Sequence, residues 1–166
     1  HLPITVAERL VAMVSDNLRE YLVTHHELPA SVATDLIIES RERATVSLLP
    51  AGAESTDVEQ LVRQLKANGR LTPSIILRAA CIGDLAFFEA SLAVLSKTPL
   101  VNAQLLIYDG GRLGLKSIYQ RAGLPEKLYP AFRVAVDVAG ETDYDGRDND
   151  RDRHVRRMIE RILTQF

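Results

Sequence analysis

Apolar residues recur every three or four positions along the first 26 residues, and this spacing predicts an amphipathic helix. A possible second N-cap at Ser15-Asp16 divides the segment into two short helices in one interpretation. The apolar residues form one continuous amphipathic stripe, which consists of Val6, Leu10, Met13, Val14, Leu18, Tyr21 and Leu22.

Helical spacing continues after Leu28-Pro29. The second predicted helix has a polar face from Glu39 to Arg43, and its apolar positions are Val32, Leu36, Ile37, Ala44 and Leu48. A third helix is expected to begin near Ser55 or Thr56 and to end at Asn68-Gly69. Its predicted core positions are Val58, Leu61, Val62 and Leu65.

The stretch from Leu71 to Pro125 is the expected centre of the molecule. Thr72-Pro73 and Thr98-Pro99 both combine a capping residue with a proline suited to the first helical turn. Gly83-Asp84 and Gly110-Gly111 then divide each unit into two helices. The stretch therefore predicts two consecutive helical hairpins.

The remaining chain also has helical spacing, and no segment alternates apolar and polar residues as a strand does. We therefore predict an all-α fold. The expected organisation is a helical domain over 1–140 with its core unit at 71–125, a charged linker over 141–152 and a C-terminal helix over 153–166.

Prolines recur with a period of 26 residues, which separates Pro3 from Pro29, Pro73 from Pro99, and Pro99 from Pro125. A fixed period of one helical element is typical of stacked helical hairpins, as in HEAT or armadillo repeats. The residues between the prolines repeat poorly. An irregular helical bundle is therefore the alternative architecture.

Composition limits the function classes. The chain has 166 residues, of which 46% are hydrophobic and 25% charged, and its net charge is −2. This balance gives no general attraction to nucleic acid, and we expect neither a nucleic-acid partner nor a membrane span. The single cysteine, Cys81, excludes an internal disulfide and favours a cytoplasmic location. The start at His1, without a secretory signal, suggests a piece of a longer protein.

Two central segments carry a family resemblance. They read GDLAFFEASLA, from Gly83, and GRLGLKSIYQRAGLP, from Gly111, and they follow the N-terminal HLPITVAERLVAMVSDNLREYL. With these segments the chain resembles a bacterial, mostly alphaproteobacterial family, domain of unknown function 2336. The resemblance covers nearly the whole chain. It implies a helical-repeat protein, and it transfers neither an activity nor a catalytic residue.

The glycine turn at Gly110-Gly111 is the main candidate for ligand binding. Arg112 and Lys116 are four residues apart on the predicted helix and, with Arg121, form a small basic ridge suited to an anion or nucleotide. The turn lacks the Gly-Lys-Ser/Thr ending of a phosphate loop and follows a helix rather than a strand. A tight corner between two helices is the alternative interpretation.

The acidic segment ETDYDGRDNDRD, from Glu141 to Asp152, resembles a twelve-residue calcium loop. Its candidate ligands are Asp143, Asp145 and Asp152. Position 8 is Asp148 rather than an apolar residue, and the last ligand is a short aspartate. A solvated charged linker is therefore the preferred interpretation, and no metal site is predicted.

Other chemical candidates favour structural roles. A helix-turn-helix over 75–94 would present Phe87, Phe88 and two acidic residues to phosphates, so a buried hairpin is preferred. Cys81 lies among apolar neighbours, which favours a buried structural thiol. The histidines lack metal-ligand spacing and are expected at helix ends or on the surface.

These observations favour a non-enzymatic module without a cofactor. We expect a helical-repeat protein that serves protein interaction or regulation, with a protein partner or with self-association. A small-ligand sensor at Arg112, Lys116 and Arg121 is the alternative.

Overall fold

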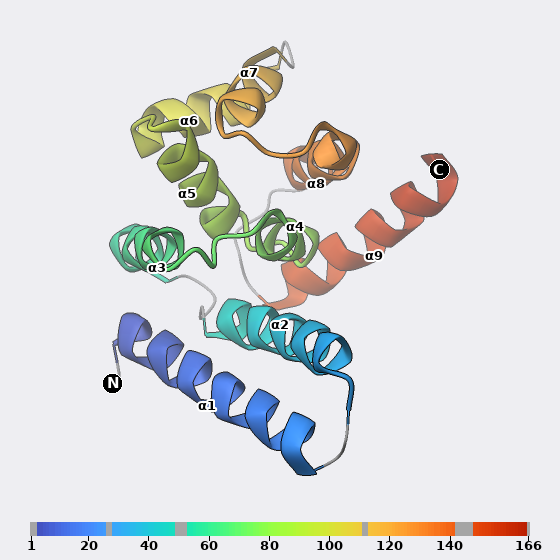
Figure 1. Cartoon of the computed structure of the whole chain (residues 1–166). Helices are drawn as coiled ribbons and strands as arrows, with labels where there is room; N and C mark the ends of the chain where they lie inside the picture. Colours follow the sequence, from blue (N-terminus) through green and yellow to red (C-terminus); the bar gives the residue numbers. More distant parts are fainter. Residues whose placement is uncertain (1–2, 26–27, 49–52, 111–112, 142–147, 166) are drawn as a thin grey trace. The chain divides into compact units, whose positions relative to one another are not determined.

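The computed structural model describes residues 3–25, 28–48, 53–110, 113–141 and 148–165. Over these ranges the chain forms nine α-helices and one short 3₁₀ helix, and no strand occurs among them (Figure 1). The predicted all-α class is confirmed. The chain divides into two compact units, His1–Pro50 and Ala51–Phe166, which we call the hairpin and the C-terminal unit.

The hairpin consists of α1 (Ile4–His25) and α2 (Ala30–Ser47), which pack against each other. The predicted break in the first helix is absent, because α1 runs uninterrupted through Ser15. The Ser15 hydroxyl donates a hydrogen bond of 2.6 Å to the carbonyl of Val11, one turn earlier. A serine that bonds back in this way satisfies its hydroxyl without starting a new helix.

The expected polar face of α2 is only partly exposed. Glu42 is buried, and Arg41 is half-buried with its guanidinium 3.9 Å from the Asp16 carboxylate of α1. Arg43 and Glu39, by contrast, form an exposed pair one turn apart at 2.8 Å. The charged segment from Glu39 to Arg43 therefore has members on both sides of the helix.

The C-terminal unit contains the remaining helices. They are α3 (Ser55–Ala67), α4 (Pro73–Cys81), α5 (Leu85–Ser96), α6 (Leu100–Ile107), α7 (Leu113–Arg121), η1 (Glu126–Leu128), α8 (Tyr129–Glu141) and α9 (Asp148–Gln165). The last helix begins at Asp148, five residues before its predicted start at 153. Residues 148–152 of the predicted linker over 141–152 therefore belong to this helix, and residues 142–147 lie outside the described residues.

Helix α5 forms the centre of this unit, because it contacts α3, α4, α6 and α7. Nine of its twelve residues are buried, Phe87 and Phe88 among them, as expected for a buried hairpin. The Phe88 ring stacks on Phe132 of α8 at 5.5 Å, and Phe132 also contacts Tyr119 at 5.4 Å. From the other side, α3 buries all four predicted core residues, Val58, Leu61, Val62 and Leu65.

The prolines stand at helix starts, as the sequence indicates, but the capping differs between them. Thr72 caps α4 by accepting a hydrogen bond of 3.2 Å from the amide of Ile75, and Pro73 occupies the first turn. At the next proline the expected cap is wrong, because Pro99 itself is the N-cap residue of α6. The Thr98 hydroxyl instead accepts a hydrogen bond of 2.9 Å from Ser96.

Helix α9 packs on α4 and α8. Its contact includes Met158, which is 2% exposed, and His154, whose Nε2 lies 3.0 Å from the carbonyl oxygen of Ala80. Within the described ranges no single helix has the length and apolar character to cross a membrane. Helices α5 and α6 have that length and apolar character only as a pair, and the pair is bent by 111°.

Candidate functional site

One side of α1 presents a row of exposed apolar side chains. Their exposed fractions range from 40% for Val6 to 64% for Val14. We call this row the α1 face, and it consists of Val6, Leu10, Met13, Val14, Leu18 and Tyr21. The spacing of three and four residues places them on one side of the helix. This is a continuous apolar strip on a surface helix.

The α1 face contains all residues of the predicted amphipathic stripe except Leu22, which is half-buried. Helix α1 has a second set of apolar residues, Ile4, Val11 and Leu22, and these are half-buried. Glu8 is the one buried residue among the 22 of the helix. The sequence of α1 contains more apolar residues than packing against one neighbouring helix requires, and this surplus is the signal for an exposed apolar surface.

Charged side chains border the α1 face. Arg9 and Glu20 are both exposed and eleven residues apart, so they lie about three turns from each other along the same border. Near the end of the helix the Tyr21 ring stacks on His25 at 4.3 Å. The His25 Nδ1 lies 2.7 Å from the Thr24 hydroxyl. His25 is thus a helix-end residue on the surface, as predicted.

The predicted basic ridge is described only in part. Arg112 lies outside the described residues, and Lys116 and Arg121 are exposed on α7. A cavity of about 340 Å³ adjoins Gly110, but neither Lys116 nor Arg121 lines it. Its charged lining residues are Asp109, Arg133, Asp137 and Arg161. Arg133 Nε lies 3.8 Å from Asp137 Oδ2, so this cavity has mixed charge.

The glycine at 114 has a packing explanation. A Cβ atom there would lie 2.9 Å from the Cβ of Asp109 and 3.0 Å from the Cα of Leu106, and closer still to the Leu106 carbonyl. The amide of Gly114 donates a hydrogen bond of 3.3 Å to the Asp109 carboxylate. The close approach of α6 and α7 therefore requires glycine, which agrees with a tight corner between two helices.

Half of the acidic segment from Glu141 to Asp152 lies outside the described residues. Asp143 and Asp145 lie outside the described residues, and Asp152 is exposed within α9. Among the residues that are described, no three His, Cys, Asp or Glu side chains gather closely enough to hold a metal ion.

Two predicted structural residues differ from expectation. Cys81 is half-buried rather than fully buried, and desolvation raises the pKa of its thiol while the nearby Arg78 opposes the shift. His154 was expected on the surface and is 1% exposed. Burial lowers the pKa of its imidazole, against the opposing effect of the hydrogen bond with Ala80. Ala80 is 74 positions earlier in the chain, so local sequence gave no indication of this contact.

A buried carboxylate joins α5 to α6. Glu89, which is 9% exposed, accepts a hydrogen bond of 2.7 Å from Gln104 Nε2 and one of 2.5 Å from the Tyr108 hydroxyl. Gln104 lies on α6 and Tyr108 is its C-cap residue one turn later, so both face the same neighbour. Because its oxygens bond to residues of the fold, we assign Glu89 a structural role.

A groove of about 900 Å³ lies within the C-terminal unit, and sequence reasoning missed it. It runs between α3 and the corner where α5 gives way to α6. We call it the α3–α6 groove. Its ionisable lining residues are Glu59, Arg63, Lys66 and Lys97, and its other walls are Ala67, Ala93, Val94, Thr98, Pro99 and Leu100.

Comparison with known proteins identifies a family without a transferable activity. The family model described as "Uncharacterised protein conserved in bacteria (DUF2336)" matches residues 1–166. Neither the curated proteins nor the solved structures include a match to the chain.

Proposed function

We propose that this chain, which belongs to the bacterial family of uncharacterised proteins DUF2336, is a non-enzymatic protein-interaction module that pairs with a second copy of itself through the α1 face. One observation carries the proposal, the exposure of six large apolar side chains along one side of α1. The largest contiguous apolar patch on a monomer typically covers about 300–600 Å² and is often a functional surface.

Charge complementarity favours a second copy in the antiparallel orientation. A two-fold axis near Val14 brings Arg9 of one copy to the level of Glu20 of the other, and the same pair forms again on the far side of the axis. Because both residues lie on the same border of the α1 face, they meet across the interface as equivalent border positions do in antiparallel helix pairs. The arrangement also places Leu10 of one copy opposite the segment between Leu18 and Tyr21 of the other copy.

The expected affinity is modest. A helix of 22 residues is about 33 Å long and about 10 Å wide, so one such strip covers on the order of 300 Å² per partner. Stable complexes bury about 800 Å² per partner. Pairing through α1 alone is therefore expected to be reversible and to require micromolar or higher protein concentrations.

Charge reversal tests both the pairing and its direction. Sedimentation equilibrium on the full chain, from a few to several hundred micromolar, is expected to show a monomer–dimer equilibrium. Arg9→Glu and Glu20→Arg should each weaken it, and the double exchange should restore it. Arg19→Glu, which changes a charge away from the α1 face, is the matched control.

A crosslink locates the axis independently. In a Cys81→Ala background, Val14→Cys is expected to form a disulfide-linked dimer under mild oxidation, because its two copies face each other. Arg19→Cys should remain monomeric. A monomer at every concentration, or a dimer unaffected by both charge reversals, would contradict the proposal.

A further inference from the structure

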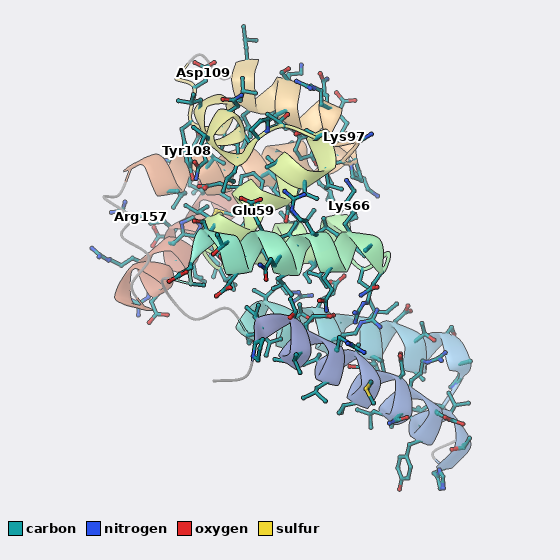
Figure 2. The ribbon with its side chains drawn as sticks, turned by 90° about the vertical axis from the view of Figure 1, so that its left-hand side faces the viewer. Glu59, Lys66, Lys97, Tyr108, Asp109 and Arg157 are labelled. Atoms are coloured by element: carbon teal, nitrogen blue, oxygen red, sulfur yellow. The ribbon has the colours of Figure 1, made fainter. Side chains whose placement is uncertain are left out.

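The α3–α6 groove gathers three cationic side chains from two distant segments. Arg63 and Lys66 are neighbours on one side of α3, and Lys97 is the residue that ends α5. Figure 2 shows Lys66 and Lys97 at the same end of the groove and Glu59 farther along α3. With Glu59 as the one acidic lining residue, the groove has a local positive charge in a chain whose net charge is −2.

Contacts within the fold hold two of these cations in place. Lys66 Nζ donates a hydrogen bond of 2.7 Å to the carbonyl of Val94 across the groove. An ammonium has three N–H donors, so two remain for a ligand. Arg63 Nη2 donates to Glu59 Oε2 at 3.1 Å, which orients the guanidinium along α3 and leaves its other donors available.

Lys97 has an unusual backbone. Its φ is 56°, in the left-handed region, and it is the one non-glycine residue with a positive φ in the described chain. Glycine is the usual residue at this position after a helix. The left-handed conformation ends α5 and turns the backbone toward α6, which begins three residues later. As a result Lys97, Thr98 and Pro99 all line the groove.

The start of α6 adds a further attraction for anions. The N-cap residue is Pro99, whose ring offers no capping side chain, and both Pro99 and Leu100 line the groove. The first amides of a helix lack partners within the helix, and the dipole places partial positive charge there. This end therefore combines two ammonium groups with a helix N-terminus, the arrangement in which phosphate groups bind.

We infer that the α3–α6 groove binds a small phosphorylated organic molecule, with its phosphate between Lys66, Lys97 and the start of α6. The organic part would lie against the apolar wall, which includes Ala93, Val94 and Leu100. A volume of about 900 Å³ falls within the range of small-molecule sites. The site is independent of the α1 face.

Calorimetric titration of the full chain tests the ligand class. The probes are a sugar phosphate, a nucleoside monophosphate, each one's dephosphorylated form, and inorganic phosphate. At least one organic phosphate should bind, its dephosphorylated form should not, and inorganic phosphate should bind more weakly. Comparison of the sugar phosphate with the nucleoside monophosphate shows which of these two classes of compound the groove binds. The inference would be overturned if every phosphorylated probe failed to bind at millimolar concentration.

Four variants locate the site. Lys66→Gln and Lys97→Gly should each lower the affinity at least ten-fold, and Lys127→Gln, an exposed lysine elsewhere, should leave it unchanged. Glycine adopts a positive φ without steric strain, so Lys97→Gly should not lower the melting temperature of the free protein. Loss of binding in that variant is therefore not a loss of folding. Binding that survives both variants but is lost in Lys116→Gln would move the site to the predicted ridge and refute the groove.

Discussion

Helices α1 and α5 both carry apolar residues and use them in opposite ways. Nine of the twelve residues of α5 are buried, whereas one of the 22 residues of α1 is buried, and that residue is the charged Glu8. The sequences differ, since α5 is apolar on nearly every side and α1 on only part of its surface. The neighbours differ too, because α5 contacts four other helices and α1 packs on α2 within its hairpin. Apolar spacing thus predicts a helix, but the neighbours decide whether its side chains form a core or a contact surface.

The largest expected effect separates these two uses. Phe88→Ala should lower the free energy of unfolding by about 3–5 kcal/mol, because a fully buried ring would leave a cavity beside Phe132. Leu10→Ala on the α1 face should cost less than about 1 kcal/mol, since the side chain is 48% exposed. Urea unfolding followed by circular dichroism at low micromolar concentration measures both. Equal costs would refute the contrast between the two helices.

A smaller effect tests how tightly the C-terminal unit is packed. Gly114→Ala should destabilise the protein by about 1–3 kcal/mol, because the added methyl group meets the backbone of α6. Gly140→Ala in α8 is the control, since a Cβ atom there meets no other atom within 4 Å. The control should be neutral or slightly stabilising. A stabilising effect of both substitutions would show that α6 and α7 separate readily.

The pH dependence of stability probes the docking of α9. Burial lowers the pKa of His154, so below about pH 6.5 the unfolded chain binds a proton more readily than the folded protein does. The free energy of unfolding should therefore fall as the pH decreases from about 6.5, by at most about 1.4 kcal/mol per pH unit. Unfolding curves between about pH 5 and 7 measure this slope. His154→Gln should flatten it, and an unchanged slope would contradict the assignment.

The smallest expected effect concerns the α1 face itself. Met13→Gln and Val14→Gln should change the stability of the monomer by no more than about 0.5 kcal/mol, because both side chains are more than half exposed. Their effect should instead appear in the monomer–dimer equilibrium. A large loss of stability at low concentration would show that these residues are buried in the monomer.

The sequence predicted those features that depend on neighbouring residues. The apolar spacing of Val58, Leu61 and Leu65 indicated both a helix and its buried side, and Thr72-Pro73 marked a helix start. Each of these rests on interactions within a turn or two of helix. The all-α class follows from the same local signals.

Features that depend on distant residues were missed. Lys66 and Lys97 meet in the α3–α6 groove only because α3 packs on α5, and the hydrogen bond from Lys66 to Val94 spans 28 positions. His154 contacts a carbonyl 74 positions away. Helical periodicity carries no information about such contacts. The predicted basic ridge, by contrast, rests on residues that are close together in sequence.

The Glu89 carboxylate has a further consequence for α6. A helix of eight residues has little stability by itself, and a rotation by one residue turns each side chain through 100°. Gln104 and Tyr108 both reach Glu89 in only one rotational setting of α6. A slip of that helix would break both hydrogen bonds together and leave a carboxylate buried. Glu89 therefore fixes the register of α6 on α5. Apolar contacts between the two helices define this register less sharply than the two hydrogen bonds do.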